Sequence, residues 1–347
     1  MLPIRIYSGD RPAGVSRYLS GFNSIYIVAD HNVRDCAHEV EKEVCAKGVF
    51  FIDASESHKN METVMDLCRW LLDSEAGRDA LVLSIGGGIT SDIAGFAACI
   101  YKRGVKYANF PTTLLAQVDA GIGGKTGVNL DGYKNMLGVI RQPEFTYICH
   151  SVLSRLPYHQ FIGGAAELVK TFIIDNKDGH YGRAISLLSK IDSSNDKSEA
   201  ILSGSEGLNV LALAAARIKA SIVEKDEYDK GERMKLNLGH TFAHAIERTA
   251  AIRSIDISHG EAVAMGIILA ARFSDRLYSG DMEALLAEDF RRAGLPVASP
   301  FAASDLWADI SKDKKAEGGE VRFVLIKAIG DVQICAIGIE EAKGLFA

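Results

Sequence analysis

Residues 80–100 read ALVLSIGGGITSDIAGFAACI, and this stretch decides the class of fold. A short β-rich run at 80–85 leads into three glycines, and the small, apolar residues at 92–100 have the composition of a buried helix. Glycines at such a turn let the backbone approach a ligand, and the N-terminus of the next helix presents N–H groups to a phosphate. The spacing differs from GxGxxG, so by itself the turn fits a simple strand-to-helix connection equally well.

Short apolar strands and helical patterns alternate on either side of this turn. The expected strands are 24–29, 49–52, 80–85 and 105–110, and the expected helices between them are 33–47, 61–74 and 92–100. This alternation predicts an α/β fold with a mostly parallel sheet covered by helices on both faces. A parallel sheet binds ligands beyond the carboxyl ends of its strands, and that context favours the glycine turn as a pyrophosphate site.

The pattern changes after about residue 158 and becomes predominantly helical. Helical periodicity marks 160–174, 208–227, 239–251, 260–278 and 281–292, while strands are expected only late, at 321–326 and 332–337. The Ser/Asp/Asn-rich stretch 189–197 is predicted to be an exposed loop. We therefore predict an α/β domain at 1–158 and an α-helical domain at 159–347.

Composition excludes several classes of protein. The 347 residues carry a formal net charge of -6, so the surface as a whole does not favour a nucleic-acid partner, and an anionic ligand needs a local basic cluster. None of the six cysteines forms a CxxC pair, which indicates small core residues in a reducing compartment. The apolar stretch 262–273 is shorter than the roughly 20 residues that span a bilayer, and residues 1–10 do not resemble a signal peptide. We expect a cytoplasmic enzyme without a membrane partner.

A basic, glycine-bearing segment occupies the centre of the α/β half. Residues 103–135 read RGVKYANFPTTLLAQVDAGIGGKTGVNLDGYKN, which contains two hydroxyls, an acid and two lysines that we expect in loops: Thr112, Thr113, Asp119, Lys125 and Lys134. A lysine beside a glycine-rich loop is a natural point charge for a phosphate or carboxylate. Either lysine alone fits a solvated loop, but both together after the PTT turn favour an anion site.

Candidate metal ligands lie in the helical half. Glu167 lies in GGAAELVK, His240 and His244 are four residues apart in NLGHTFAHAIE, and His259 lies in SHGEAVAMG. The two histidines of the HxxxH pair share one helix face. One carboxylate with two or three imidazoles suits zinc or a similar divalent ion and leaves a position open for substrate. A lone histidine on a helix is more often structural, but burying several polar groups among small apolar residues is costly unless they are paired or metal-bound.

Basic and amide side chains accompany these histidines. They are Lys170, one turn after Glu167, then Lys219, Arg233, Asn237 and the lysines within 312–315. Surplus positive charge beside a metal and a nicotinamide-sized phosphate site predicts a small, anionic, hydroxylated substrate. The metal would polarise a substrate oxygen, and the nicotinamide would accept hydride from the carbon that bears it.

These motifs together resemble the 3-dehydroquinate synthase family, within the superfamily that includes glycerol dehydrogenases and iron-dependent alcohol dehydrogenases. The resemblance extends from residue 30 to residue 329 and is densest at 86–95, 102–135, 163–170, 219–247 and 259–266. It implies an N-terminal Rossmann-like NAD domain and an α-helical C-terminal domain for metal and substrate. It also implies a homodimer in which Arg103 reaches the neighbouring subunit's site.

The resemblance also implies a role for each matching residue. The metal ligands, for zinc or cobalt, would be Glu167, His240 and His259, and His244 would instead contact substrate or handle a proton. NAD contacts would be Asp30, Asn32, Glu56, Lys59, Gly87, Gly88, Asp92, Thr112, Thr113 and Lys134, with Lys125 serving cofactor and substrate. Substrate contacts would be Asp119, Lys125, Asn135, Lys170, Lys219, Arg233, Asn237 and one of Lys314 and Lys315.

The implied reaction converts 3-deoxy-D-arabino-heptulosonate 7-phosphate to 3-dehydroquinate and phosphate. NAD transiently oxidises C5, which acidifies the C6 hydrogen so that phosphate is eliminated, and reduction and an intramolecular aldol closure follow. The alternatives are a related cyclase acting on sedoheptulose 7-phosphate and a metal-dependent polyol dehydrogenase. Lys125, Asn135, Lys219 and Arg233 together argue against the first alternative. Departures from the family pattern are Ser55, Tyr133, Arg155, Asp229 and Ala243.

Overall fold

The structure of the protein, a computed structural model, describes residues 3–229, 231–314 and 319–346. The chain forms two compact units. The first comprises Met1–Leu156 and Ile201–Glu224, and the second comprises Pro157–Ala200 and Lys225–Ala347. The predicted boundary after residue 158 lies close to the first of these divisions. Residues 201–224, which the sequence pattern grouped with the helical domain, belong to the first unit.

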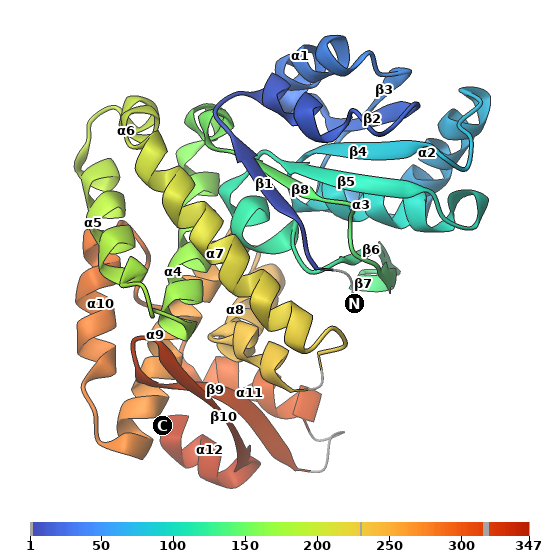
Figure 1. The fold of residues 1–347 in the computed structure, drawn as a ribbon. Coiled ribbons are helices and arrows are strands. Elements are labelled where there is room, and N and C mark those ends of the chain that lie inside the picture. Colours follow the sequence, from blue (N-terminus) through green and yellow to red (C-terminus); the bar gives the residue numbers. More distant parts are fainter. Residues whose placement is uncertain (1–2, 230, 315–318, 347) are drawn as a thin grey trace. The chain divides into compact units, whose positions relative to one another are not determined.

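Six strands form the central sheet of the first unit, in the order β1-β8-β5-β4-β2-β3 (Figure 1). They span Ile6–Gly9 (β1), Ile25–Asp30 (β2), Gly48–Ile52 (β3), Leu81–Gly86 (β4), Lys106–Pro111 (β5) and Thr146–Cys149 (β8). Every pairing in this sheet is parallel, which confirms the predicted class of fold. Strands β1 and β8 were not predicted, because four residues are too few to establish a period-2 pattern.

Alternate side chains of each central strand enter two separate cores. Ile27 of β2 belongs to the core that contains α1 (Arg34–Val44), whereas Val28 belongs to the core that contains α2 (Met61–Asp73) and α3 (Gly88–Ile100). Successive side chains of a strand point to opposite faces, so an uninterrupted apolar strand can bury both of them. Helices therefore cover both faces of the sheet, as predicted.

A two-stranded hairpin follows the sheet strand β5, and it corrects one expectation. Strands β6 (Lys125–Leu130) and β7 (Tyr133–Ile140) pair antiparallel, so Lys125 and Lys134 lie in strands and not in loops. The turn residues Asp131 and Gly132 have φ values of 50° and 83°. Two successive left-handed residues are what a tight hairpin turn needs, and an Asp-Gly pair is its sequence signal. The glycines and exposed polar residues of this segment obscured that signal.

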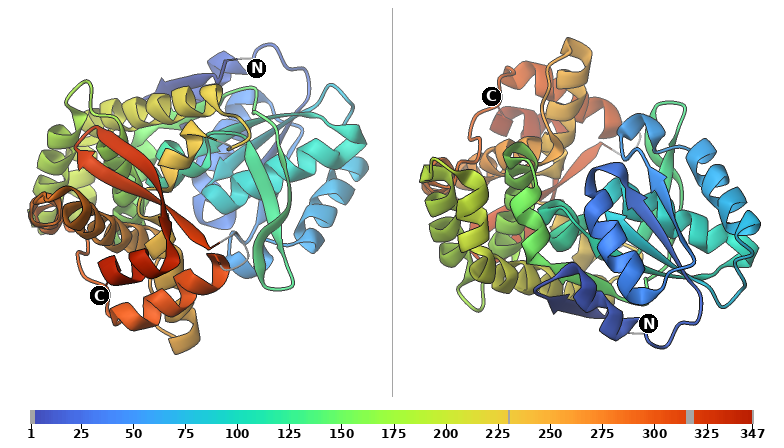
Figure 2. Two further views of the ribbon diagram at one scale, coloured as in Figure 1. Left: turned by 90° about the horizontal axis from the view of Figure 1, so that it is seen from below. Right: turned by 90° about the horizontal axis from the view of Figure 1, so that it is seen from above.

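The second unit is mainly helical and carries one antiparallel hairpin. Its helices are α4 (Tyr158–Ile174), α5 (His180–Ser193), α8 (His240–Arg253), α9 (His259–Tyr278), α10 (Met282–Arg292), α11 (Ala303–Lys314) and α12 (Ile339–Phe346). The hairpin consists of strands β9 (Glu320–Ala328) and β10 (Asp331–Gly338), which are red in Figure 2. Strand β9 packs against α9. Each of the five helices predicted after residue 158 begins and ends within three residues of the bounds of an observed helix. One of them is α7 (Ser205–Lys225), which belongs almost wholly to the first unit.

The loop predicted at 189–197 was wrong over most of its length. Helix α5 continues to Ser193 and α6 (Lys197–Ser203) begins soon afterwards, which leaves only residues 194–196 outside a helix. Leu188 and Ile191 extend the buried face of α5, so packing outweighs the loop-like Ser/Asp composition.

Among the described residues, no single helix is long and apolar enough to cross a bilayer. Only α6 and α7 taken together reach that measure, across a bend of 72°.

Candidate active site

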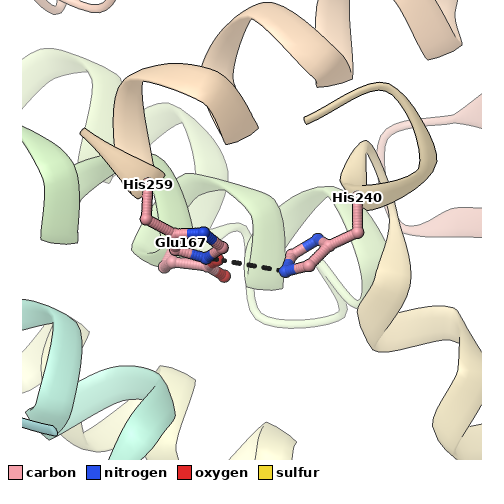
Figure 3. Close-up of side chains that lie close together, drawn as sticks. All are labelled: Glu167, His240 and His259. Atoms are coloured by element: carbon pink, nitrogen blue, oxygen red, sulfur yellow. Dashed lines mark ion pairs between the residues drawn. The ribbon is translucent and has the colours of Figure 1, made fainter. Parts of the chain in front are cut away.

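Three candidate metal ligands meet in the second unit. Glu167 comes from the middle of α4, and His240 and His259 are the first residues of α8 and α9 (Figure 3). Glu167 Oε1 lies 3.6 Å from His240 Nε2 and 3.4 Å from His259 Nε2. One ligand atom from each of the three residues lies within 4.8 Å of the others. A single divalent ion can therefore be reached by all three side chains.

Two close approaches between helices set this arrangement. A Cβ atom on Gly260 would lie 2.2 Å from both the Cα and the carbonyl oxygen of Gly163, so α9 and α4 touch backbone to backbone. A Cβ atom on Gly266 would lie 2.3 Å from the carbonyl oxygen of Gly239, which precedes His240. Only glycine permits such contacts. The first contact holds the amino end of α9 against α4, and the second holds the amino end of α8 against Gly266, seven residues after His259 in α9.

The chemistry of the three donors fits a cation. Glu167 is completely buried, and neither of its carboxylate oxygens makes a hydrogen bond of normal geometry with any described residue. Its charge is balanced by Lys170, whose Nζ lies 2.5 Å from Oε2. A buried carboxylate oxygen without a hydrogen bond is costly, and a metal ion bound beside two imidazoles would remove that cost.

The electrostatics of the three residues differ. Burial by itself would raise the pKa of Glu167, but Lys170 and the two imidazoles hold that pKa well below its ordinary value. Burial, together with Lys170, lowers the pKa of His240 to about 3, so this imidazole is neutral and able to coordinate. Burial also opposes charge on His259, but its interactions with Glu167 and Glu247 outweigh burial and raise its pKa to about 10.

His244 stands beside this cluster without belonging to it. Its ring centroid lies 5.7 Å from that of His240, with the rings nearly perpendicular. Among the described residues, Glu167, His240 and His259 form a possible metal site, and His244 is not one of its three members. The substrate-side role of His244 remains a prediction.

Arg233 is a buried cation of the second unit and lies in the short 3-10 helix Glu232–Asn237. The Asp226 carboxylate accepts hydrogen bonds from the backbone N–H groups of Gly231 and Arg233, and Arg233 Nη1 donates to the Glu227 carbonyl at 2.7 Å. Asn237 is the last residue of the same short helix. The side chain of Lys314 and the whole of Lys315 lie outside the described residues, so their predicted phosphate contact is untested.

The first unit holds a separate polar cluster around Lys59. The buried Lys59 ammonium donates to Asp92 Oδ2 and to Asn135 Oδ1, each at 2.6 Å. Burial raises the pKa of Asp92 to about 6, even though Lys59 opposes the shift. Asn129, which the sequence analysis missed, donates to Glu56 Oε1 and accepts from the backbone N–H of Asn135. Four residues predicted to bind cofactor or substrate therefore belong to one hydrogen-bonded network.

The glycine turn of the first unit has the form expected of a phosphate site. Helix α3 follows β4 directly, with Gly87 as its N-cap residue and no side chain capping its first N–H groups among the described residues. A Cβ atom on Gly88 would lie 2.9 Å from the Cβ of Ala120, so the turn is closely packed. The backbone N–H of Thr112 donates to the Gly86 carbonyl, and Thr113 Oγ1 accepts from Ala116.

Further predicted site residues of the first unit lie outside the Lys59 cluster and the glycine turn. Lys219 of α7 donates to Asp119 Oδ1 at 2.5 Å and to its carbonyl at 2.9 Å, and Asp119 belongs to the π-helix Ala116–Ala120. Asp30 ends β2 and accepts two hydrogen bonds from Asn32. Arg103 is exposed and has a left-handed backbone, with φ of 69°. Single π-helical turns occur frequently at functional sites.

Comparison with known proteins identifies the family of the chain. Models of the 3-dehydroquinate synthase N-terminal and C-terminal regions match residues 49–163 and 164–316. A 3-dehydroquinate synthase from Streptococcus sanguinis is 36% identical over 92% of this chain and 88% of its own length.

Solved structures share the fold. The 2-epi-5-epi-valiolone synthase from Streptomyces hygroscopicus subsp. jinggangensis 5008, determined with NAD+ and Zn2+ bound, is 25% identical, with a TM-score of 0.84 over 99% of this chain and 96% of its own. A 2-deoxy-scyllo-inosose synthase complexed with carbaglucose-6-phosphate, NAD+ and Co2+ is 23% identical, with a TM-score of 0.80 over 98% of this chain and 95% of its own. From the family models and the sequence relative, this chain belongs to the 3-dehydroquinate synthase family.

Proposed function

We propose that this chain is a 3-dehydroquinate synthase, which converts 3-deoxy-D-arabino-heptulosonate 7-phosphate to 3-dehydroquinate and phosphate. Membership of the family supports this assignment over most of the chain. The observation that carries it within the molecule is the buried Glu167 carboxylate, which faces two imidazoles and whose oxygens make no hydrogen bond of normal geometry among the described residues. Such a group is suited to hold a divalent ion that contacts a substrate oxygen.

The residues present fit both implied cofactors. Glu167, His240 and His259 would hold Zn2+ or Co2+, and the uncapped first turn of α3 would receive the pyrophosphate of NAD. The other NAD contacts would come from Asp30, Asn32, Glu56, Lys59, Asp92, Thr112, Thr113, Lys125 and Lys134. When bound, the metal supplies Lewis acidity at a substrate oxygen and the nicotinamide supplies a reversible hydride acceptor.

The chain's own cations would bind and orient the anionic substrate. Lys219 has its ammonium fixed by Asp119, and the buried Arg233 donates a hydrogen bond to the Glu227 carbonyl. Fixed cations bind a phosphate or carboxylate without first having to be ordered. Lys170 keeps Glu167 ionised, and His244, close to His240, is the candidate for moving a proton at a substrate oxygen. Lys125, Asn135 and Asn237 complete the proposed substrate contacts.

One assay separates the candidate functions. The metal-loaded protein is incubated with 3-deoxy-D-arabino-heptulosonate 7-phosphate and catalytic NAD, and the release of inorganic phosphate is followed. Release beyond one equivalent per NAD is expected, because NAD is regenerated in each turnover. Net accumulation of NADH would identify a polyol dehydrogenase instead. Phosphate release from sedoheptulose 7-phosphate alone would assign the chain to a different cyclase, and the Glu167→Gln variant serves as the inactive control.

Two further properties belong to the proposal. Arg103 would reach the neighbouring site in a homodimer, and its exposure leaves the guanidinium accessible to another subunit. Sedimentation of the protein should then give twice the mass of the chain, and mixing Arg103→Ala subunits with Glu167→Gln subunits should restore part of the activity. A cytoplasmic location is also proposed, and fractionation of cells that produce the protein would test it.

A further inference from the structure

Glu247 is a carboxylate of the second unit that the proposed reaction does not use. It lies on α8 seven residues after His240 and three after His244, so all three side chains share one face of the helix. Its Oε1 lies 3.5 Å from His259 Nδ1, and about a fifth of its side chain is exposed. Helix α8 therefore supplies one candidate metal ligand and a carboxylate that contacts another.

His259 is held between two carboxylates. Its Nε2 faces Glu167 at 3.4 Å, while its Nδ1 faces Glu247. An imidazole coordinates a metal through a nitrogen without a proton, and its other nitrogen then carries the proton and needs an acceptor. Because Glu247 is on the Nδ1 side, the ring presents Nε2 towards the candidate metal position. His240 has the corresponding arrangement, with its Nδ1 3.2 Å from the Leu238 carbonyl.

Another carboxylate close to His259 in the sequence is engaged elsewhere. Glu261, two residues after His259, forms a capping box with Ser258: its carboxylate accepts from the Ser258 backbone and hydroxyl at 2.8 and 2.6 Å. It stabilises the first turn of α9 and therefore the backbone position of His259, the first residue of that helix. Orientation of the imidazole ring about its own bonds needs a contact with the ring itself, and Glu247 makes that contact.

We propose that Glu247 is a positioning residue of the metal centre, which accepts the Nδ1 proton of His259 and so directs Nε2 towards the metal. This inference rests on the proposed metal-dependent function. Removal of the acceptor leaves the ring free to rotate or to change tautomer, and loss of such an outer partner typically weakens metal binding about 10–100-fold. Glutamine can still accept the proton through its amide oxygen, so Glu247→Gln should lose less affinity than Glu247→Ala.

The test measures metal binding without turnover. Apo protein is titrated with Co2+ against a chelator of known affinity, and the visible d–d absorption of the bound Co2+ is recorded. We expect Glu247→Ala to bind Co2+ about 10–100-fold more weakly with an altered spectrum, and Glu247→Gln to be intermediate. Arg248→Ala is the matched control, because Arg248 is the next residue of α8 and faces Asp309. It should bind Co2+ as the unaltered protein does.

Each outcome decides something different. Unchanged Co2+ affinity and spectrum in both Glu247 variants would overturn the inference, even if the thermal midpoint of the apo protein fell, because that is the result of a purely structural role. Failure of the unaltered protein to bind Co2+ would overturn the proposed function itself. If Glu247→Ala does not fold, Glu247→Gln with Arg248→Ala still decides the question.

Discussion

Asp92 in the first unit and Glu167 in the second are both buried carboxylates paired with a lysine, yet their pKa values move in opposite directions. Burial dominates at Asp92 and raises its pKa to about 6, with Glu56 adding to the effect of burial. At Glu167 the same effect of burial is outweighed by Lys170 and two imidazoles, so the pKa falls well below its ordinary value. In the first unit the Asp92 carboxylate is paired with the Lys59 ammonium. In the second unit the Glu167 carboxylate faces two imidazoles, which are candidate metal ligands, in addition to its lysine.

The largest effect is expected from a substitution that disrupts only the cluster of Glu167, His240 and His259 in the second unit. Glu167→Gln removes the carboxylate ligand, and metal affinity should fall by more than about a hundredfold, the upper range for loss of an outer partner. Metal content after dialysis measures this, and His259→Ala should behave similarly. Arg233→Ala and Asp92→Asn should keep their metal. Loss of metal from Arg233→Ala would show that the assigned division of roles is wrong.

The next effect breaks the first cluster alone. Lys59→Met leaves Asp92 without its ammonium partner, and breaking a buried pair costs about 3 kcal/mol of unfolding free energy. Urea unfolding of the apo protein measures the loss. Metal affinity should not change, since no metal candidate is in this network. A variant as stable as the unaltered protein would contradict the proposed contribution of this pair.

A smaller effect tests the helix contact beneath the metal candidates. In Gly260→Ala the added Cβ meets the backbone of Gly163, so α4 and α9 must separate at a cost of about 1–3 kcal/mol. The distance from Glu167 to His259 should increase and metal affinity should weaken. Gly182→Ala in α5 is the control, because a Cβ there meets nothing within 4 Å. Thermal unfolding with and without Co2+ distinguishes the two variants.

The smallest effect is a dependence of stability on pH. Asp92 has a folded pKa of about 6 against an ordinary value of 3.8, so the folded state binds the extra proton. Its contribution to stability is full below about pH 4 and is lost as the pH rises through 6. Unfolding free energies measured from about pH 4 to pH 7 should therefore decline less steeply in Asp92→Asn. Parallel curves for the two proteins would refute this reading of Asp92.

Sequence patterns predicted the parts of the fold that depend on local order. The strand entering the glycine turn and the helix α9 both follow from periodicity and composition. The contacts of Glu247 and Asn129 could not be obtained in this way, because their partners come from other elements. For Glu247 a signal did exist in retrospect, since a carboxylate seven residues after His240 lies on the same helix face. For Asn129 the hairpin had to be known first.

The discontinuity of the first unit has a consequence for synthesis of the chain. Its segment Ile201–Glu224 is made only after residues 157–200, which belong to the other unit. Asp119 is therefore synthesised a hundred residues before Lys219, the group that neutralises it. On a ribosome, where domains tend to fold as units from the N-terminus, the first unit would wait for part of the second to emerge. A fragment ending at residue 156 would lack α7 and leave Asp119 without this partner, so the two units are not separable by a single cut in the chain.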